Sequence, residues 1–285
     1  MSIFDEPKID GHCHVLDPAR FPYSAAVAYR PGGQEIGTLD QYLQVMDAYG
    51  IEHALLVGPN SGYGLDNRCL LDAIERGGDR FRGIAVVRND ATREELVGLR
   101  AAGVIGVAFN ATVLGVDHYK GTGTLLRQLA NLDMFVQVQV EHDQLVALRP
   151  LLERSGARVL IDHCGRPNPL KGLEQAGFQA LLAMAGTRRV AVKLSGQQKF
   201  STVAPPHEDA QRFVRALLDA FTLEACFWAS DWPFLKATQR LDIGPLLRQV
   251  ELLLPDEADR RRLWWDTPRR WLGFETRRGA TASPA

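Results

Sequence analysis

The segment Ile9-Asp10-Gly11-His12-Cys13-His14 has the pattern of a buried strand that ends in two histidines one residue apart. Side chains at positions i and i+2 of a strand point to the same side, so both imidazoles are expected to project into one space. An open, doubly wound sheet normally carries a glycine-rich phosphate turn after its first strand, and the histidines occupy that place here. The segment therefore favours a barrel and marks a candidate site. A pair of hydrogen-bonded structural histidines is the alternative for these two residues alone.

Apolar, β-branched runs alternate with amphipathic stretches through most of the 285 residues. Eight strands separated by helices, without an internal linker, predict an α/β fold, a distorted (β/α)8 TIM barrel in a single domain over residues 1–276. We expect strands near 8–14, 52–58, 82–87, 104–109, 134–140, 158–162, 190–194 and 225–229. We expect helices near 39–49, 66–77, 92–102, 122–132, 143–154, 173–185, 207–221, 240–254 and 257–272.

The composition excludes some classes of protein. The formal net charge is −1, so the clustered basic excess that nucleic acid or a membrane surface requires is absent. We find no apolar run of about 20 residues and no secretory leader, and we expect a cytoplasmic monomer or homodimer with a small-molecule substrate. The four cysteines form no CxxC motif and are expected to be reduced thiols. Strand parity turns Cys13 and Cys164 away from the neighbouring histidines.

Two segments lie outside the regular pattern. Residues 17–38 form a long insertion with prolines, glycines and aromatic residues after the first strand. Loops of this length are usually functional or disordered, so we interpret the insertion as a candidate lid. The small, polar residues 277–285 are expected to form a flexible tail.

Polar side chains follow most of the predicted strands at their C-terminal ends, where barrel enzymes have their active sites. The converging set is His12, His14, Asn110, Gln139, Glu141, His163, Lys193, Ser195 and Asp231. Among them, Asn110, Gln139 and Lys193 are expected to bind the substrate. The other histidines, His53, His118, His142 and His207, lie near expected helix starts or loops and are interpreted as structural or exposed.

Three imidazoles and one carboxylate suit two kinds of chemistry. They could hold one divalent zinc or manganese ion with an open position for water, through His12, His14, His163 and Asp231. They also suit a metal-independent site, in which the imidazoles polarise a carbonyl and Asp231 accepts a proton from water. Arg166, at the expected mouth, could clamp a substrate carboxylate or pair with a loop acid.

Three motifs together resemble the amidohydrolase-related (amidohydrolase 2) family. They are Asp10-Gly-His-Cys-His14, Ile161-Asp-His-Cys-Gly-Arg-Pro167 and Ala229-Ser-Asp-Trp-Pro233, and the resemblance covers most of the chain. It is strongest to the lactonase branch typified by 2-pyrone-4,6-dicarboxylate hydrolase. The resemblance implies hydrolysis of a lactone ring. It also implies that the three histidines surround the scissile carbonyl, that Asp231 is the general base, and that Tyr29, Asn60, Ser61 and Arg166 hold the substrate.

The chain departs from that branch where the dicarboxylate would be clamped. An arginine is expected before Phe109-Asn110, but the chain has Ala108, and residues 111–118 contain no arginine. A tyrosine expected on the fifth strand is Gln139. Arg30, Lys193 and Lys199 are the basic residues that could replace the clamp. The segment 192–196 is more similar to the sugar-lactonase relatives.

The sequence therefore predicts a lactone hydrolase that acts on a small anionic lactone of the pyrone-dicarboxylate, muconolactone or sugar type. One alternative is a metal-dependent non-oxidative decarboxylase of the same superfamily, which would release carbon dioxide without opening a ring. A second alternative is a catalytically silent barrel that serves as a binding protein. The presence of both histidine motifs together with Asp231 on separate strands disfavours it.

Overall fold

The computed structural model describes residues 2–274, and its centre is an eight-stranded parallel sheet whose strands follow one another in chain order. The backbone N–H of His14 donates to the carbonyl of Trp232, and that of Asp231 donates to the carbonyl of His12, both at 2.8 Å. These bonds join the segment that follows the last strand to the end of the first strand, and with the sheet they confirm the single-domain barrel. The strands are β1 (Lys8–Cys13), β2 (Ile51–Val57), β3 (Phe81–Ala85), β4 (Val104–Asn110), β5 (Phe135–Gln139), β6 (Arg158–Ile161), β7 (Val190–Leu194) and β8 (Cys226–Trp228).

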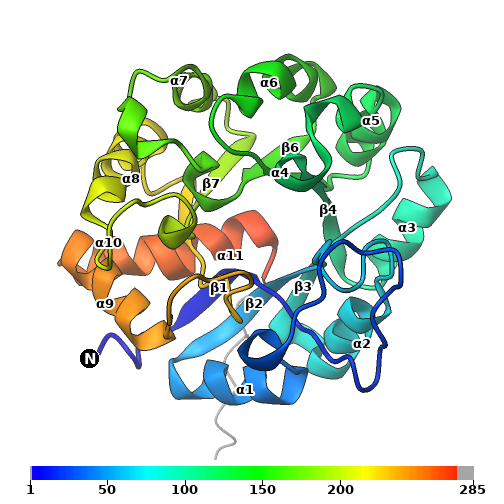
Figure 1. Cartoon of the computed structure of the whole chain (residues 1–285), viewed down its shortest axis with the longest axis horizontal. Coiled ribbons are helices and arrows are strands. Elements are labelled where there is room, and N and C mark those ends of the chain that lie inside the picture. Colours follow the sequence, from blue (N-terminus) through cyan, green and yellow to red (C-terminus); the bar gives the residue numbers. More distant parts are fainter. Residues whose placement is uncertain (1, 275–285) are drawn as a thin grey trace, which may run out of the picture.

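Helices surround the strands, as Figure 1 shows. They are α1 (Leu39–Ala48), α2 (Arg68–Gly77), α3 (Arg93–Ala101), α4 (Ala111–Leu114), α5 (Gly123–Asn131), α6 (Gln144–Ser155), α7 (Ala176–Leu182), α8 (Glu208–Phe221), α9 (Ile243–Leu253), α10 (Glu257–Arg261) and α11 (Thr267–Leu272). The expected helix 257–272 is interrupted by a π-helical turn, η7 (Arg262–Asp266), in which Leu263 and Trp264 are both buried. The short helix α4 was not predicted from the sequence.

The apolar core has two parts. The larger part lies between the strands and the helices, and it includes Cys13 and Cys164, as strand parity predicted. The smaller part fills the barrel interior toward the N-terminal ends of the strands. It contains strand residues such as Ile9, Phe135 and Phe227, together with Trp271 of α11. Arg158, the first residue of β6, donates to the carbonyl of Trp271 at 2.8 Å, so α11 covers the N-terminal ends of the strands. The opposite end is left for polar side chains.

The insertion 17–38 is irregular except for a short 3₁₀ turn, η1 (Gly33–Glu35). The N–H of Ser24 donates to the carbonyl of Gly62, and the N–H of Gly62 donates to the carbonyl of Tyr29, so the insertion is attached to the loop after β2.

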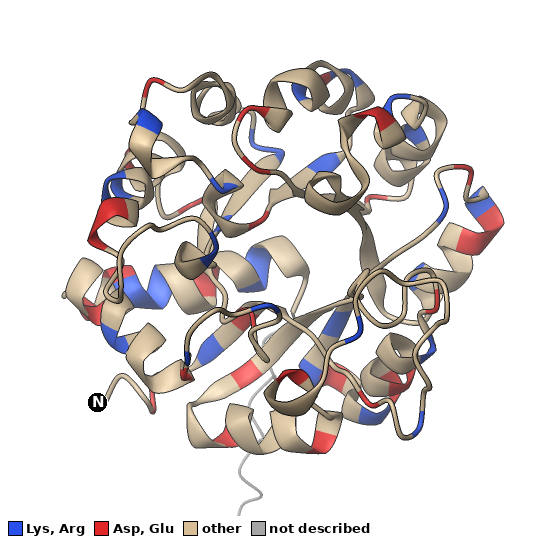
Figure 2. Ribbon diagram, in the orientation of Figure 1, with Lys and Arg blue, Asp and Glu red and all other residues tan. Residues whose placement is uncertain are grey.

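The expected tail, 277–285, lies outside the described residues. Within residues 2–274, no helix has the length and apolar character of a membrane span. Figure 2 shows acidic and basic residues intermingled on the outer helices.

The expectation for His53 needs a correction. It lies within β2, not near a helix start or loop, and its buried ring stacks on Phe274 with 4.6 Å between ring centroids. His118 and His142 are exposed, and His207 is buried at the N-terminus of α8. None of the four lines the central cavity described below.

Candidate active site

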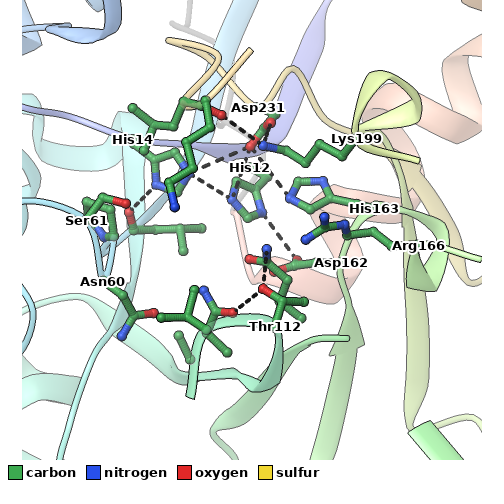
Figure 3. A pocket seen from close by; sticks show the side chains of 18 of the residues that line it. His12, His14, Asn60, Ser61, Thr112, Asp162, His163, Arg166, Lys199 and Asp231 are labelled. Atoms are coloured by element: carbon green, nitrogen blue, oxygen red, sulfur yellow. Dashed lines mark hydrogen bonds and ion pairs between the residues drawn. The ribbon is translucent and has the colours of Figure 1, made fainter. Parts of the chain in front are cut away.

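Three histidines and Asp231 meet at the C-terminal end of the barrel (Figure 3). The Nε2 atoms of His12 and His14 are 3.2 Å apart. Oδ1 of Asp231 lies 3.8 Å from Nε2 of His12, 3.7 Å from Nε2 of His14 and 3.6 Å from Nε2 of His163. All four side chains are buried. The structure thus brings together the four residues that the strand ends predicted, and their catalytic roles stay predictions.

The backbone around this cluster is held in an uncommon conformation. Asp231 has a φ of 63° and His163 a φ of 51°, in the left-handed region that non-glycine residues rarely adopt. Gly196, with a φ of 63°, lies directly against the His163 ring, and a Cβ at this position would be 2.6 Å from it. Such strain persists only where the surrounding structure enforces it, which is typical of functional sites.

The outer nitrogen of each imidazole has a hydrogen-bond partner that orients the ring. Nδ1 of His14 is 2.7 Å from the carbonyl oxygen of Val57, and Nδ1 of His163 is 3.0 Å from Oγ of Ser195. A carbonyl oxygen only accepts, so the proton of neutral His14 is on Nδ1 and its Nε2 has a free lone pair. That lone pair faces the centre of the cluster.

Beneath the cluster lies a buried polar layer of Lys193, Asp162 and Gln137, of which only Lys193 was predicted to belong to the site. Nζ of Lys193 is 3.1 Å from Oδ1 of Asp162, 2.5 Å from Oε1 of Gln137 and 3.2 Å from Nδ1 of His12. Lys193 is 0% exposed and is not among the residues that line the cavity, so in this structure its ammonium lies against His12 rather than at the cavity surface. Asp162 was not predicted as a site residue, although its place directly before His163 at the end of β6 was a usable signal.

Asp162 completes the support of His12. Its Oδ1 is 3.2 Å from Nδ1 of His12, and its Oδ2 accepts from Nε2 of Gln137 at 2.9 Å. Burial alone would raise the pKa of Asp162, but the Lys193 ammonium and His12 lower it well below its usual range. The layer therefore combines an ionised carboxylate with a buried cation below the histidines.

The charge states of the cluster follow from burial and from Lys199. Burial lowers the pKa of His12 to about 4, with the Lys193 ammonium acting in the same direction. Burial also lowers the pKa of His163. For Asp231, burial would raise the pKa, but the Lys199 ammonium, 2.8 Å from Oδ2, and then His163 hold it well below its usual range. At neutral pH, His12 and His163 are therefore neutral beside an ionised carboxylate.

A cavity of about 340 Å³ opens above the cluster. Five residues expected to bind substrate line it: Asn60, Ser61, Asn110, Gln139 and Arg166. Oδ1 of Asn110 accepts from the hydroxyl of Thr112 at 2.7 Å, and Nε2 of Gln139 donates to the same hydroxyl at 3.3 Å. The strand ends thus place a row of amide groups in one wall.

Tyr29 is not among the residues that line the cavity in this structure. Its hydroxyl donates to Oε2 of Glu35 at 2.5 Å, and the other carboxylate oxygen of Glu35 accepts from the backbone N–H of Lys236 at 2.5 Å. Nζ of Lys236 lies 4.6 Å from the centre of the Tyr29 ring. Tyr29 therefore supports Lys236, which does line the cavity and which the sequence did not single out.

The cluster could hold a divalent cation. His12, His14 and Asp231 offer three ligand atoms within 4.8 Å of one another, and His163 lies on the same side. A tetrahedral site with bonds of about 2.0–2.1 Å has ligand atoms about 3.3 Å apart, so separations of 3.2–3.8 Å need only a small contraction. The lone pair on His14 Nε2 and the ionised Asp231 are the donor types that zinc prefers, and Asp162 supplies the supporting carboxylate.

A parallel barrel with three histidines and an aspartate at the C-terminal ends of its strands has the site position and the side-chain types of barrel enzymes that activate water. Residues 9–274 match the family model described as amidohydrolase, and the chain belongs to that family. It is 32% identical to a 4-sulfomuconolactone hydrolase of Rhizobium radiobacter over 93% of this chain and 89% of that protein. It is 28% identical to a 2-pyrone-4,6-dicarboxylate hydrolase of Comamonas testosteroni over 92% and 88% of the two chains.

A solved structure agrees with these relatives. The crystal structure of a probable 2-pyrone-4,6-dicarboxylic acid hydrolase from Acinetobacter baumannii, with citric acid bound, superposes with a TM-score of 0.85. It is 27% identical and covers 94% of this chain and 99% of that chain. The resemblance that the three sequence motifs indicated is confirmed.

Proposed function

We propose that this protein hydrolyses the ring ester of a small anionic lactone. The observation that carries the proposal is the convergence of three imidazole Nε2 atoms on Oδ1 of Asp231 below a polar cavity. The cavity wall also contains Arg166, Lys199 and Lys236. The named relatives support the proposal, because they act on 4-sulfomuconolactone and on 2-pyrone-4,6-dicarboxylate, which are both anionic lactones.

In the proposed reaction, Asp231 takes a proton from the attacking water. The water oxygen bonds to the lactone carbonyl carbon, the ring C–O bond breaks, and Asp231 returns the proton to the departing ring oxygen. Lys199 keeps Asp231 ionised before the reaction. Asn110 and Gln139 offer amide groups to the polar substituents of the lactone. A positioned general base of this kind contributes roughly 10²- to 10⁴-fold to the rate.

We propose that one zinc or manganese ion is held by His12, His14, His163 and Asp231. When bound, such an ion would supply a Lewis acid that polarises the lactone carbonyl. The hydrogen bond between Nδ1 of His14 and the carbonyl of Val57 supports this version. With its proton on Nδ1, neutral His14 has no N–H to donate to a lactone oxygen, whereas its lone pair suits a cation. In the metal-independent version, His12 and His163, not His14, would have to polarise the carbonyl.

The substrate is expected to carry fewer or differently placed charges than a pyrone dicarboxylate. Ala108 lines the cavity where the dicarboxylate branch was expected to have an arginine, and α4 supplies Thr112 and Val113 to the same wall. Each charged hydrogen bond lost to a carboxylate is worth roughly 1.5–3 kcal/mol. We also propose that the insertion 17–38 contributes to the site through Tyr29. The Tyr29 ring packs against the Lys236 ammonium and holds it at the mouth of the cavity.

A panel of lactones tests the proposal. The protein, loaded in turn with zinc and manganese, is mixed with muconolactones, sugar lactones and 2-pyrone-4,6-dicarboxylate, and ring opening is followed by absorbance and proton release. We expect turnover of at least one anionic lactone and a loss of turnover in Asp231→Asn. Absence of turnover across the panel by the folded, metal-loaded protein would contradict the proposal. Release of carbon dioxide from an aromatic acid without ring opening would instead identify the decarboxylase alternative.

A further inference from the structure

The cationic side chains in the cavity wall are not equally available to a substrate. Nζ of Lys199 pairs with Asp231 at 2.8 Å, and NH2 of Arg166 pairs with Oε2 of Glu141 at 3.2 Å. Among residues 2–274, the cavity-lining Lys236 makes no ion pair with a carboxylate, and its Nζ lies over the Tyr29 ring. The wall thus contains one cation without a carboxylate partner and two that are already neutralised.

The pair of Arg166 and Glu141 is built into the barrel rather than formed by two free surface side chains. Glu141 follows β5 and Arg166 follows β6, and the N–H of His142 donates to the carbonyl of Arg166 at 3.0 Å. The Arg166 side chain is 19% exposed, and the Glu141 side chain is 33% exposed. Nε of Arg166 is buried and has no hydrogen-bond partner. The guanidinium therefore keeps an unused donor while Glu141 neutralises its charge.

The pair also separates two spaces. Glu141, Arg166 and Lys199 line the central cavity and also a second cavity of about 270 Å³. A substituent that extends from the lactone ring toward the second cavity passes these three side chains. Because Arg166 and Lys199 are already paired with Glu141 and Asp231, an anionic substituent meets no free cation there, and the carboxylate of Glu141 repels it.

We propose that Glu141 is a specificity-determining residue that restricts the site to lactones with one charged substituent by neutralising Arg166. This inference rests on the proposed function for its substrate class. In the wild-type protein, the single charge is met by Lys236. When the carboxylate of Glu141 is removed, Arg166 becomes a free, partly buried cation that can form a bidentate contact with a second substrate carboxylate.

Binding of stable ring acids tests the inference without requiring turnover. Benzene-1,3-dicarboxylate carries two carboxylates in the same relative positions as 2-pyrone-4,6-dicarboxylate, and benzoate carries one. We expect Glu141→Gln to bind the dicarboxylate at least about tenfold more tightly by calorimetry, with less than a threefold change for benzoate. The gain must disappear in the double variant Glu141→Gln/Arg166→Met. Equal changes for both acids, or a gain that persists without Arg166, would overturn the proposal.

Two further measurements separate this inference from the proposed function and from misfolding. Glu153→Gln removes the carboxylate of an ion pair with Arg149 on the outer helix α6, and it is expected to change neither affinity. The double variant Glu141→Gln/Arg166→Met has no charge at either position, as the neutralised pair has none in sum, and it is expected to bind the dicarboxylate within threefold of the wild-type protein. A gain of tenfold or more in that double variant would also refute the inference. If no lactone is hydrolysed, the proposed function fails, yet the binding ratios still decide the role of Glu141.

Discussion

Replacement of Asp231 by asparagine tests the central chemical argument. Asparagine has the same shape as aspartate, and its amide oxygen can still accept from Lys199, which is 2.8 Å from Oδ2 in the structure. The change removes the charge on which the Nε2 atoms of His12, His14 and His163 converge. Loss of a general base lowers the rate by roughly 10²- to 10⁴-fold, or about 2.7–5.4 kcal/mol at 1.36 kcal/mol per factor of ten. We expect kcat/KM to fall at least about 100-fold.

The fold should survive this substitution. The variant loses an ion pair but also loses the cost of burying a charge, so the two effects offset each other and Tm is expected to change by only about 5 °C or less. Steady-state kinetics on the best lactone and thermal unfolding measure the two quantities on one preparation. Asp242→Asn, which removes the carboxylate paired with the exposed Arg240, is the control and should retain full activity. A folded Asp231→Asn protein with more than about a tenth of wild-type kcat/KM would refute the assignment of the base.

Three further predictions concern the support of the cluster. Lys199→Met removes the cation that lowers the pKa of Asp231, so this pKa should rise. The acidic limb of the pH profile of kcat/KM should then move to higher pH. An acidic limb at the wild-type pH would contradict the effect of Lys199 on Asp231. Gly196→Ala places a Cβ 2.6 Å from the His163 ring and should lower both Tm and activity, whereas Gly172→Ala, with a similar positive φ and open space, should lower Tm alone. If the enzyme is metal-dependent, chelation should abolish activity with little change in Tm, because the barrel core does not depend on one ion. If the enzyme is metal-independent, chelation should change neither activity nor Tm. Global unfolding on chelation would contradict both versions.

Local patterns in the sequence were sufficient to predict the barrel. The eight predicted strands each overlap an observed strand, because β-branched apolar runs of this length bury their side chains on both faces of a parallel sheet. The predicted helix boundaries near the C-terminus were less accurate. The π-helical turn Arg262–Asp266 interrupts an expected continuous helix, since burial of both Leu263 and Trp264 depends on packing that the 3.6-residue period does not encode.

The sequence by itself also determined which residues meet: His12, His14, His163 and Asp231 all occupy strand ends, and topology brings strand ends together in any barrel. How deeply each side chain is buried, and which charged side chains pair with one another, were decided only by the tertiary structure. Lys193 lies at a strand end like the others, yet it is buried beneath His12 and contacts no cavity. The pairs Lys199–Asp231 and Arg166–Glu141 join residues from different loops, 32 and 25 positions apart. Their formation depends on strand register and loop conformation to within an ångström, and the residue pattern of one chain does not contain those distances.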